Sequence, residues 1–456
     1  MTSPARRIGV VHPYWSFWES AIEHDFAEDR RCLAALAVVT LKETAEIAWS
    51  VTVQPGDDTD AVVAGLARNI HAIVVVSTMA ASPSAVLAVL AAFPTTPVVI
   101  WATHEGLGVD PDFSHSGITL RGGTVGAPMI GAYLTRAGRP FDVIASEITN
   151  VGGVAPAVRR ATAAGAVRTA RLGVIGSTIP GYEWERVADD RLEALGIEVT
   201  AYDPSVLRDK VLTSAPDRTA MTGFTVDTQL SEADLDLAMR YSTALEEIIE
   251  EGRLSAGTLN CHVAELRLNP ELGAAPCFAL GRATSRGVPW TCTGDVATSL
   301  AMLLVSSLGA PTLYHEIEAL DEITNEAILA NSGEHDARFA SADEKRVIVS
   351  PWFPSATATA SALFSIAPGP ASLVGVVSGP DGGLAVVVAT GRFTDRTSPR
   401  TGTSNATFVF ENGAVLESWS RWTATGVGHH SCATDRHVAR DLEVVCRHLG
   451  IEFTEI

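Results

Sequence analysis

The sequence is poor in basic residues and has no long apolar run. Its 456 residues include 33 Lys and Arg against 53 Asp and Glu, which gives a net charge of −20 at pH 7. Long-range repulsion from this charge argues against nucleic acid and anionic membrane surfaces as partners. The longest apolar stretches, such as residues 85–93, are well short of the roughly 20 residues that cross a bilayer.

Several familiar motifs are also missing. The six cysteines contain no Cys-x-x-Cys pair, so they indicate neither a disulfide framework nor a zinc ribbon. Residues 1–26 lack the apolar core of a signal peptide. There is no Walker loop, and Gly173-x-x-Gly176 has the wrong spacing for a dinucleotide fingerprint. We therefore expect a cytoplasmic protein without a nucleotide cofactor.

What is present indicates a large globular protein. Hydrophobic residues make up 46% of the chain and charged residues only 19%, which supports sizeable buried cores. At about 150 residues per domain, the length indicates roughly three domains. We place them at residues 1–168, 169–345 and 346–456.

The first two regions have the pattern of α/β domains, in which apolar strands alternate with helices. The strands predicted in the first region are 8–11, 72–77, 98–102 and 143–145, with helices at 60–68 and 83–92. Those predicted in the second are 171–176, 198–202, 258–263 and 312–317, with helices at 183–195, from Ser231, and from Asp295 to Leu308. Ser231 with Asp234 forms a capping box, and Gly309 stops the last helix.

From about Val347 the pattern changes to short strands separated by turns rich in Gly, Pro, Ser and Thr, which predicts an antiparallel sheet or barrel. The predicted hairpins join 373–377 to 384–389, and 407–410 to 415–419. A helix from Thr434, stopped by Gly450, and a strand over 451–456 complete the region.

One carboxylate and several imidazoles from separate segments form the best candidate site. Glu316 lies in a predicted strand, His335 follows a turn, and His429 and His430 lie in a Gly-rich loop. Such a set suits a divalent metal such as Mn²⁺, Co²⁺, Fe²⁺ or Zn²⁺. The alternative is that the adjacent loop histidines are ordinary surface groups. Asp295 lies at a predicted helix N-terminus, where backbone dipoles favour an anion.

Two other features have competing interpretations. Cys292 is either a nucleophile or a buried structural thiol, and no base is tied to it by sequence. The aromatic residues after the first strand either pack against the core or form a wall for a ligand or a neighbouring subunit. They are Tyr14, Trp15, Phe17 and Trp18.

Four short motifs follow one another in the second half of the chain. They are Cys292-Thr-Gly-Asp-Val296, Tyr314-His-Glu316, Gly333-Glu-His335 and Gly428-His-His430. In this order they resemble the L-fucose isomerase and L-arabinose isomerase family. The loop Arg121-Gly-Gly-Thr-Val-Gly126 and the closing run Leu449-Gly-Ile-Glu452 are similar to that family as well. The resemblance implies two Rossmann-like parallel-sheet domains followed by an antiparallel C-terminal β-barrel domain.

The resemblance also implies an activity, the interconversion of an aldose and a ketose through a cis-enediol. The substrate would be a pentose, a deoxyhexose or a modified sugar, and the cofactor Mn²⁺ or a similar ion. By position, Glu316, His335 and His430 would hold the ion, Glu316 would also move protons, and His429 would contact the substrate. Homotrimers or homohexamers are implied, with Arg121 or the aromatic residues completing a neighbour's site.

Two positions depart from the family. Where the family has its first catalytic Glu, this chain has Thr293, which cannot act as a carboxylate ligand or as a base near neutral pH. Thr293 is then a substrate contact, and Glu316 acts alone or with a stand-in: Asp295, which we favour, Glu318 or Glu334. Arg121 replaces a His of the arabinose isomerases. It indicates either a substrate with an anionic group or a surface arginine.

Three functions follow from these observations. A metal-dependent sugar isomerase is the preferred hypothesis. A metal-dependent epimerase, lyase or dehydratase acting on a polyhydroxylated sugar or sugar acid is the second, because one enolising base and one Lewis acid suffice for it. The third is a non-catalytic sugar-binding relative, which the retention of Glu316, His335 and His430 argues against.

Overall fold

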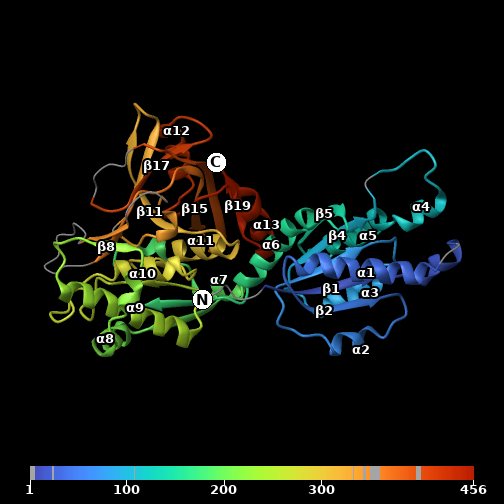
Figure 1. Ribbon diagram of the computed structural model, residues 1–456, viewed down its shortest axis with the longest axis horizontal. Helices are drawn as coiled ribbons and strands as arrows, with labels where there is room; N and C mark the ends of the chain where they lie inside the picture. Colours follow the sequence, from blue (N-terminus) through green and yellow to red (C-terminus); the bar gives the residue numbers. More distant parts are fainter. Residues whose placement is uncertain are drawn as a thin grey trace. The chain divides into compact units, whose positions relative to one another are not determined.

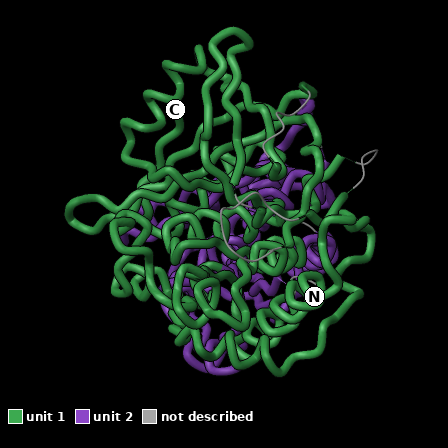
Figure 2. The backbone as a smooth tube through the Cα atoms, turned by 90° about the vertical axis from the view of Figure 1, so that its left-hand side faces the viewer, with its two compact units in different colours: residues 1, 167–456 green, residues 2–166 purple. Residues whose placement is uncertain are grey.

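The computed structural model describes residues 6–22, 25–106, 108–331, 333–341, 346–349, 360–396 and 402–456. The chain forms two compact units, residues 2–166 and residues 167–456, which we call the N-terminal and C-terminal units (Figure 2). Within the described ranges, none of the helices combines the length and apolarity needed to cross a membrane. The division into three domains stays a prediction.

The N-terminal unit is built on a parallel sheet with strand order β2-β1-β3-β4-β5. Its strands are β1 (Arg7–Pro13), β2 (Glu46–Val53), β3 (Ala72–Ser77), β4 (Val98–His104) and β5 (Phe141–Glu147). Every residue of β3 is buried, because β-branched side chains fill both faces of the strand. The sequence did not predict β2, whose side chains are mostly half-exposed.

Helices cover both faces of this sheet. They are α1 (Phe26–Lys42), α2 (Thr59–Ala64), α3 (Ser84–Ala91), α4 (His115–Leu120), α5 (Gly123–Arg136) and α6 (Val151–Val167), with the 3-10 turn η1 (Ser16–Ala21) after β1. Apolar residues of α1 and α6 pack on one face, and those of α3 and α5 pack on the other (Figure 1).

The aromatic residues after β1 divide between packing and exposure. Tyr14, Trp15 and Trp18 pack against a small buried cluster that includes Phe26. The indole Nε1 of Trp18 also donates a hydrogen bond to the carbonyl of Ala80, at 2.7 Å. Phe17, in contrast, is 61% exposed. Packing therefore accounts for three of the four rings.

The C-terminal unit contains a second parallel sheet, with strand order β10-β9-β6-β7. Its strands are β6 (Arg171–Ile175), β7 (Glu198–Tyr202), β9 (Ala256–Leu259) and β10 (Trp290–Thr291). The helices and turns joining them to each other and to the barrel are η2 (Glu183–Glu185), α7 (Asp189–Ala194), α8 (Pro204–Thr213), η3 (Arg218–Met221), α9 (Glu232–Gly252), α10 (Cys277–Ser285) and α11 (Val296–Ser307).

A closed, six-stranded antiparallel barrel forms the rest of the core of this unit (Figure 1). Its strands, in order around the barrel, are β15 (Gly369–Ser378), β18 (His430–Thr434), β11 (Leu313–Asp321), β12 (Glu326–Ala330), β17 (Asn405–Phe410) and β16 (Leu384–Phe393), which pairs with β15 again. β19 (Glu452–Glu455) adds a parallel strand beside β16. Because β11 and β12 belong to it, the barrel begins before residue 346.

Smaller elements complete the unit. A three-stranded sheet contains β8 (Phe224–Val226), β13 (Arg346–Val349) and β14 (Ser361–Leu363), and the remaining elements are η4 (Ala337–Phe339), α12 (Val415–Ala424) and α13 (Ala439–Leu449). The protein is therefore a mixed α/β fold with two parallel sheets and an antiparallel barrel, as predicted at that level of detail.

Local signals in the sequence were reliable guides to several elements. Ser231 and Asp234 form both hydrogen bonds of the predicted capping box at the start of α9. The carboxylate of Asp295 accepts a hydrogen bond from the amide of Thr298 at 2.8 Å and so caps α11. The hairpin of β15 and β16 is also confirmed.

Three predicted elements differ in the structure. Residues 415–419 are not a strand but the start of α12, because Val415, Ser418 and Trp422 place one buried stripe at helical spacing. The predicted helix over 183–195 is broken, since Arg186 has an extended backbone between η2 and α7. The last helix begins at Ala439, not at Thr434, which ends β18.

The Gly-Gly loop marks a close approach between α5 and the sheet. A Cβ atom added at Gly123 would lie 2.2 Å from the carbonyl oxygen of Ser77 and 2.8 Å from that of Thr103. Both neighbours are backbone atoms at the ends of buried strands, so neither can move away cheaply. Glycine at this position lets the N-terminus of α5 lie directly on the sheet.

We therefore predict that Gly123→Ala destabilises the N-terminal unit by about 1–3 kcal/mol, the usual cost of overpacking. Urea unfolding followed by tryptophan fluorescence measures the change. Gly108→Ala is the matched control, because a Cβ atom there has no neighbour within 4 Å. Equal unfolding midpoints for the two variants would contradict the close approach.

Candidate functional site

The candidate site lies in the C-terminal unit, where barrel strands meet a loop that follows the second parallel sheet. In the register of β11 and β18, Glu316 is directly opposite His430, so their side chains are neighbours on one face. Residues 292–295 lead from β10 into α11 and bring Thr293 and Asp295 to the same place.

A cavity of about 180 Å³ opens beside these residues. Thr293, Tyr314, Glu316, His429 and His430 contribute to its lining. A volume of about 150 Å³ accommodates a benzene molecule in an engineered protein cavity, so this space suits a small ring or a short polyol.

His430 is the most highly connected side chain of the site. Its Nδ1 lies 2.9 Å from Oε1 of Glu185 and 3.2 Å from Oδ2 of Asp295, and its Nε2 lies 3.1 Å from Oε1 of Glu316. Burial lowers the pKa of His430, but hydrogen bonds to Asp295, Glu185 and Glu316 outweigh it and raise the pKa to about 11. In the absence of a cation His430 is therefore an imidazolium at neutral pH, and it would have to release one proton to bind a metal ion.

The carboxylates around His430 have different environments. Burial raises the pKa of Glu185 above its ordinary value, although the hydrogen bond to His430 works in the opposite direction. For Glu316 the burial effect is smaller than the combined effect of the hydrogen bond and charge of His430, so its pKa is lowered. Glu316 is thus an ionised carboxylate at neutral pH, and its side chain is 30% exposed.

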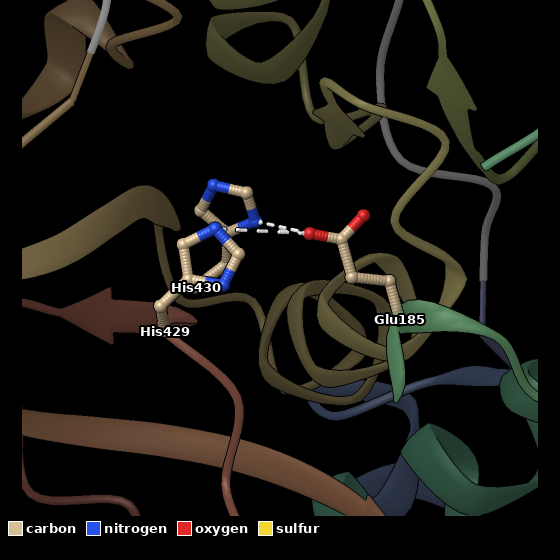
Figure 3. Close-up of side chains that lie close together, drawn as sticks. All are labelled: Glu185, His429 and His430. Carbon is tan, nitrogen blue, oxygen red and sulfur yellow. Dashed lines mark hydrogen bonds and ion pairs between the residues drawn. The ribbon is translucent and has the colours of Figure 1, made fainter. Parts of the chain in front are cut away.

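Glu185, His429 and His430 form a compact group (Figure 3). Their nearest ligand atoms all lie within 4.8 Å of one another, and among the described residues this is the one set of three or more that does so. His429 Nε2 lies 3.9 Å from Oε1 of Glu185. Carboxylate and imidazole groups at such distances have the composition of a divalent-cation site.

Sequence analysis did not find Glu185. It is the last residue of η2. Tyr182, which precedes this turn, stacks on Trp184, and both rings contact His429 edge-on. Trp184 is 53% exposed, whereas Glu185 is only 2% exposed. No local motif separates Glu185 from the chain's other acidic residues; its contacts with Thr293 and His430 exist only in the folded chain.

The structure brings most of the predicted site residues together. Thr293, Glu316, His429 and His430 line the cavity, and Asp295 contacts His430. Arg121 belongs to the N-terminal unit, where it donates a hydrogen bond to the carbonyl of Gly108. Its proposed contact with substrate stays a prediction.

His335 is not part of the compact group of Glu185, His429 and His430 and does not line the cavity, and its predicted role as a metal ligand stays a prediction. Its ring is 2% exposed and lies edge-on to Phe364, and its backbone is pressed against Gly281 of α10. The neighbouring Glu334 lines the cavity instead, and its Oε2 is buried with no hydrogen-bond partner among the described residues. Glu318, the other stand-in considered, is exposed on β11.

Three buried thiols form another part of the cavity wall. They belong to Cys261, Cys277 and Cys292. The Sγ atoms of Cys261 and Cys292 are 4.0 Å apart, and this contact together with burial raises the pKa of Cys292 well above its ordinary value. A thiol that stays protonated is a poor nucleophile, so the interpretation of Cys292 as a structural residue is favoured.

Comparisons with known proteins leave the family open. No protein-family model matches the chain, and no curated protein matches it significantly. The resemblance to the fucose and arabinose isomerases therefore stays a prediction, which depends on the motifs and on the geometry described above.

Because His335 is buried and neutral, we expect the stability of the folded chain to fall in acid. Burial lowers the pKa of His335 from 6.5 to about 3, so below pH 6.5 the unfolded chain binds a proton that the folded chain does not. The contribution of neutral His335 to the free energy of unfolding is therefore complete above pH 6.5 and is lost as the pH falls toward 3. At pH 5 this difference amounts to about 2 kcal/mol.

Accordingly, His335→Leu should reduce the loss of unfolding free energy between pH 7 and pH 5 by about 2 kcal/mol, measured by urea titration at both values. His437→Gln, at an exposed position of the same unit, is the control. If both variants lose as much stability as the unmodified protein, His335 does not carry the effect.

Proposed function

We propose that this protein is a divalent-metal-dependent sugar isomerase that interconverts an aldose and a ketose. The observation that carries the proposal is the pairing of Glu316 with His430 on the wall of a small cavity. Both residues come from motifs that resemble the fucose and arabinose isomerases. The resemblance suggests the reaction, and the cavity supplies a place for a small polyol.

The donor set fits a divalent cation in distance. Bonds of about 2.1 Å from a metal to nitrogen and oxygen place two ligands at right angles about 3.0 Å apart. In the absence of a cation the 3.1 Å contact between Nε2 of His430 and Oε1 of Glu316 is a hydrogen bond, and the same separation would also suit two ligands of one ion. The ring centroid of His429 lies 3.8 Å from that of His430, so His429 is close enough to supply a further nitrogen ligand.

The donor set also fits in charge. The carboxylates of Glu185, Asp295 and Glu316 surround one imidazole, which is neutral when it binds a metal, so His430 would then supply no positive charge to this group. Clustered, buried carboxylates are costly unless positive charge compensates them. A divalent cation supplies that compensation, and Mn²⁺ is the ion we favour, with Co²⁺, Fe²⁺ and Zn²⁺ as alternatives.

The residues then have distinct tasks. When bound, the cation acts as a Lewis acid toward the oxygen atoms on the two reacting carbons of the sugar. Glu316 is ionised and reaches the cavity, so it takes the proton from one carbon and returns it to the other, as a general base and then a general acid. Thr293 supplies a hydroxyl group to the cavity wall, and Tyr182 with His429 forms another side of the cavity.

Incubation of the purified protein with MnCl₂ and a panel of aldoses and ketoses in D₂O should give sugar conversion and deuterium at C1 or C2, measured by NMR. Glu316→Gln should lower the rate about 10²- to 10⁴-fold, because the amide cannot accept the proton. Glu322→Gln, at an exposed turn after the same strand, should retain the full rate.

Several outcomes would contradict the proposal. If no sugar in the panel takes up deuterium in the presence of Mn²⁺, the protein is not an isomerase of these sugars. Thermal stabilisation by a sugar without any metal dependence would instead favour a sugar-binding protein. Exchange that persists at the full rate in Glu316→Gln would assign the proton transfer to another residue.

A further inference from the structure

The two ring nitrogens of His430 face different surroundings. Nε2 lies on the cavity side, 3.1 Å from Oε1 of Glu316. Nδ1 lies on the opposite side of the ring, 2.9 Å from Oε1 of Glu185, a residue that does not line the cavity. A neutral imidazole has one N–H group and one lone pair, so only one of these sides can bind a cation.

We propose that Glu185 is a positioning residue: it accepts a hydrogen bond from Nδ1–H of His430 and so leaves Nε2, on the side of Glu316 and the cavity, as the nitrogen that would bind a cation. This inference rests on the proposed metal centre and assigns a residue that no motif identified. Metal-binding histidines commonly donate their second N–H group to a carboxylate, which fixes the tautomer and the ring orientation.

Glu185 is better placed for this task than the other carboxylate near Nδ1. Asp295 lies slightly farther from the ring, at 3.2 Å; its Oδ1 caps α11 through the amide of Thr298, and its Oδ2, the oxygen near His430, also accepts a hydrogen bond from the hydroxyl of Tyr314 at 3.4 Å. Glu185 is 2% exposed, and no such helix-capping bond engages its carboxylate. Its second oxygen, Oε2, contacts a different residue.

That residue is Thr293. Its hydroxyl oxygen lies 2.9 Å from Oε2 of Glu185 and 2.8 Å from the carbonyl oxygen of Cys292, so the carboxylate shares the single hydroxyl hydrogen with that carbonyl. Thr293 has φ of 60°, and it is the one β-branched residue in the described ranges with a left-handed backbone. Such a conformation is unfavourable for threonine and persists only where the surroundings hold it. The turn thus holds the hydroxyl group against the carboxylate that orients His430.

This chain of contacts gives a reason for threonine at position 293. A glutamate there would bring another carboxylate close to Glu185, where like charges repel. Threonine supplies a hydrogen-bond donor at the same place without a charge. Thr293 and Glu185 therefore form a matched pair on the Nδ1 side of His430.

Calorimetric titration with MnCl₂ distinguishes a positioning residue from a direct ligand. We expect Glu185→Leu to weaken Mn²⁺ binding 10- to 100-fold, the usual effect of losing the carboxylate behind a metal-binding histidine. Glu185→Gln should remain within about threefold of the unmodified protein, because its amide oxygen still accepts from Nδ1–H while its amide N–H group donates to Thr293.

Glu183→Gln is the matched control, since it changes an exposed glutamate in the same turn. Circular dichroism establishes that each variant is folded. A second readout needs no metal: the ¹H–¹⁵N resonance of Nδ1–H of His430 should be retained in Glu185→Gln and lost in Glu185→Leu. This resonance also tests the hydrogen bond in any variant that binds Mn²⁺ poorly.

The outcomes separate this inference from the proposed function. If Glu185→Gln weakens Mn²⁺ binding as much as Glu185→Leu, Glu185 is a direct ligand and the positioning role is overturned. If neither variant affects binding or the resonance, Glu185 has no role at the centre. If the unmodified protein binds Mn²⁺ and shows the expected differences but exchanges no sugar, the isomerase function fails and the role of Glu185 stands.

Discussion

The contact of one imidazole with carboxylates from three other segments is the interaction on which the candidate site depends. His430 begins a barrel strand, Glu316 lies on the neighbouring strand, Asp295 caps a helix, and Glu185 comes from a turn after the second parallel sheet. Burying these groups costs free energy that a fold without a function would avoid by using apolar residues. Their presence together is therefore an argument for function.

The register of the barrel is the second constraint. Glu316 faces His430 and His315 faces Ser431, because side chains alternate along paired antiparallel strands. A slip of one residue would exchange these pairs and turn Glu316 away from the cavity. His315 is fully buried on the other face, where burial lowers its pKa to about 4 and it stays neutral. Two adjacent histidine-containing pairs thus have opposite electrostatic roles.

The sequence predicted elements whose signals are local and missed those set by distant contacts. The cap at Asp295 and the capping box at Ser231 each depend on a few neighbouring residues, so their patterns were sufficient. Glu185 and His335 were different. A glutamate in a broken helix became central through contacts with residues more than a hundred positions away, whereas a histidine in a matching motif packed beside Phe364. The resemblance pointed to His430, which does line the cavity, but it could not show what lies behind the imidazole ring.

Position 293 carries threonine where the resembled family has an acid, and this difference has two consequences that must be considered together. Alone, it removes a carboxylate and weakens the case for a metal enzyme. Together with Glu185, it leaves a hydroxyl group that donates to a buried carboxylate, and that carboxylate in turn contacts His430. The number of acidic groups around the imidazole is then three, although position 293 contributes none. Because burial penalises each added charge, a further acid at 293 would burden an environment that already carries an excess of negative charge, and threonine is the residue that this arrangement favours.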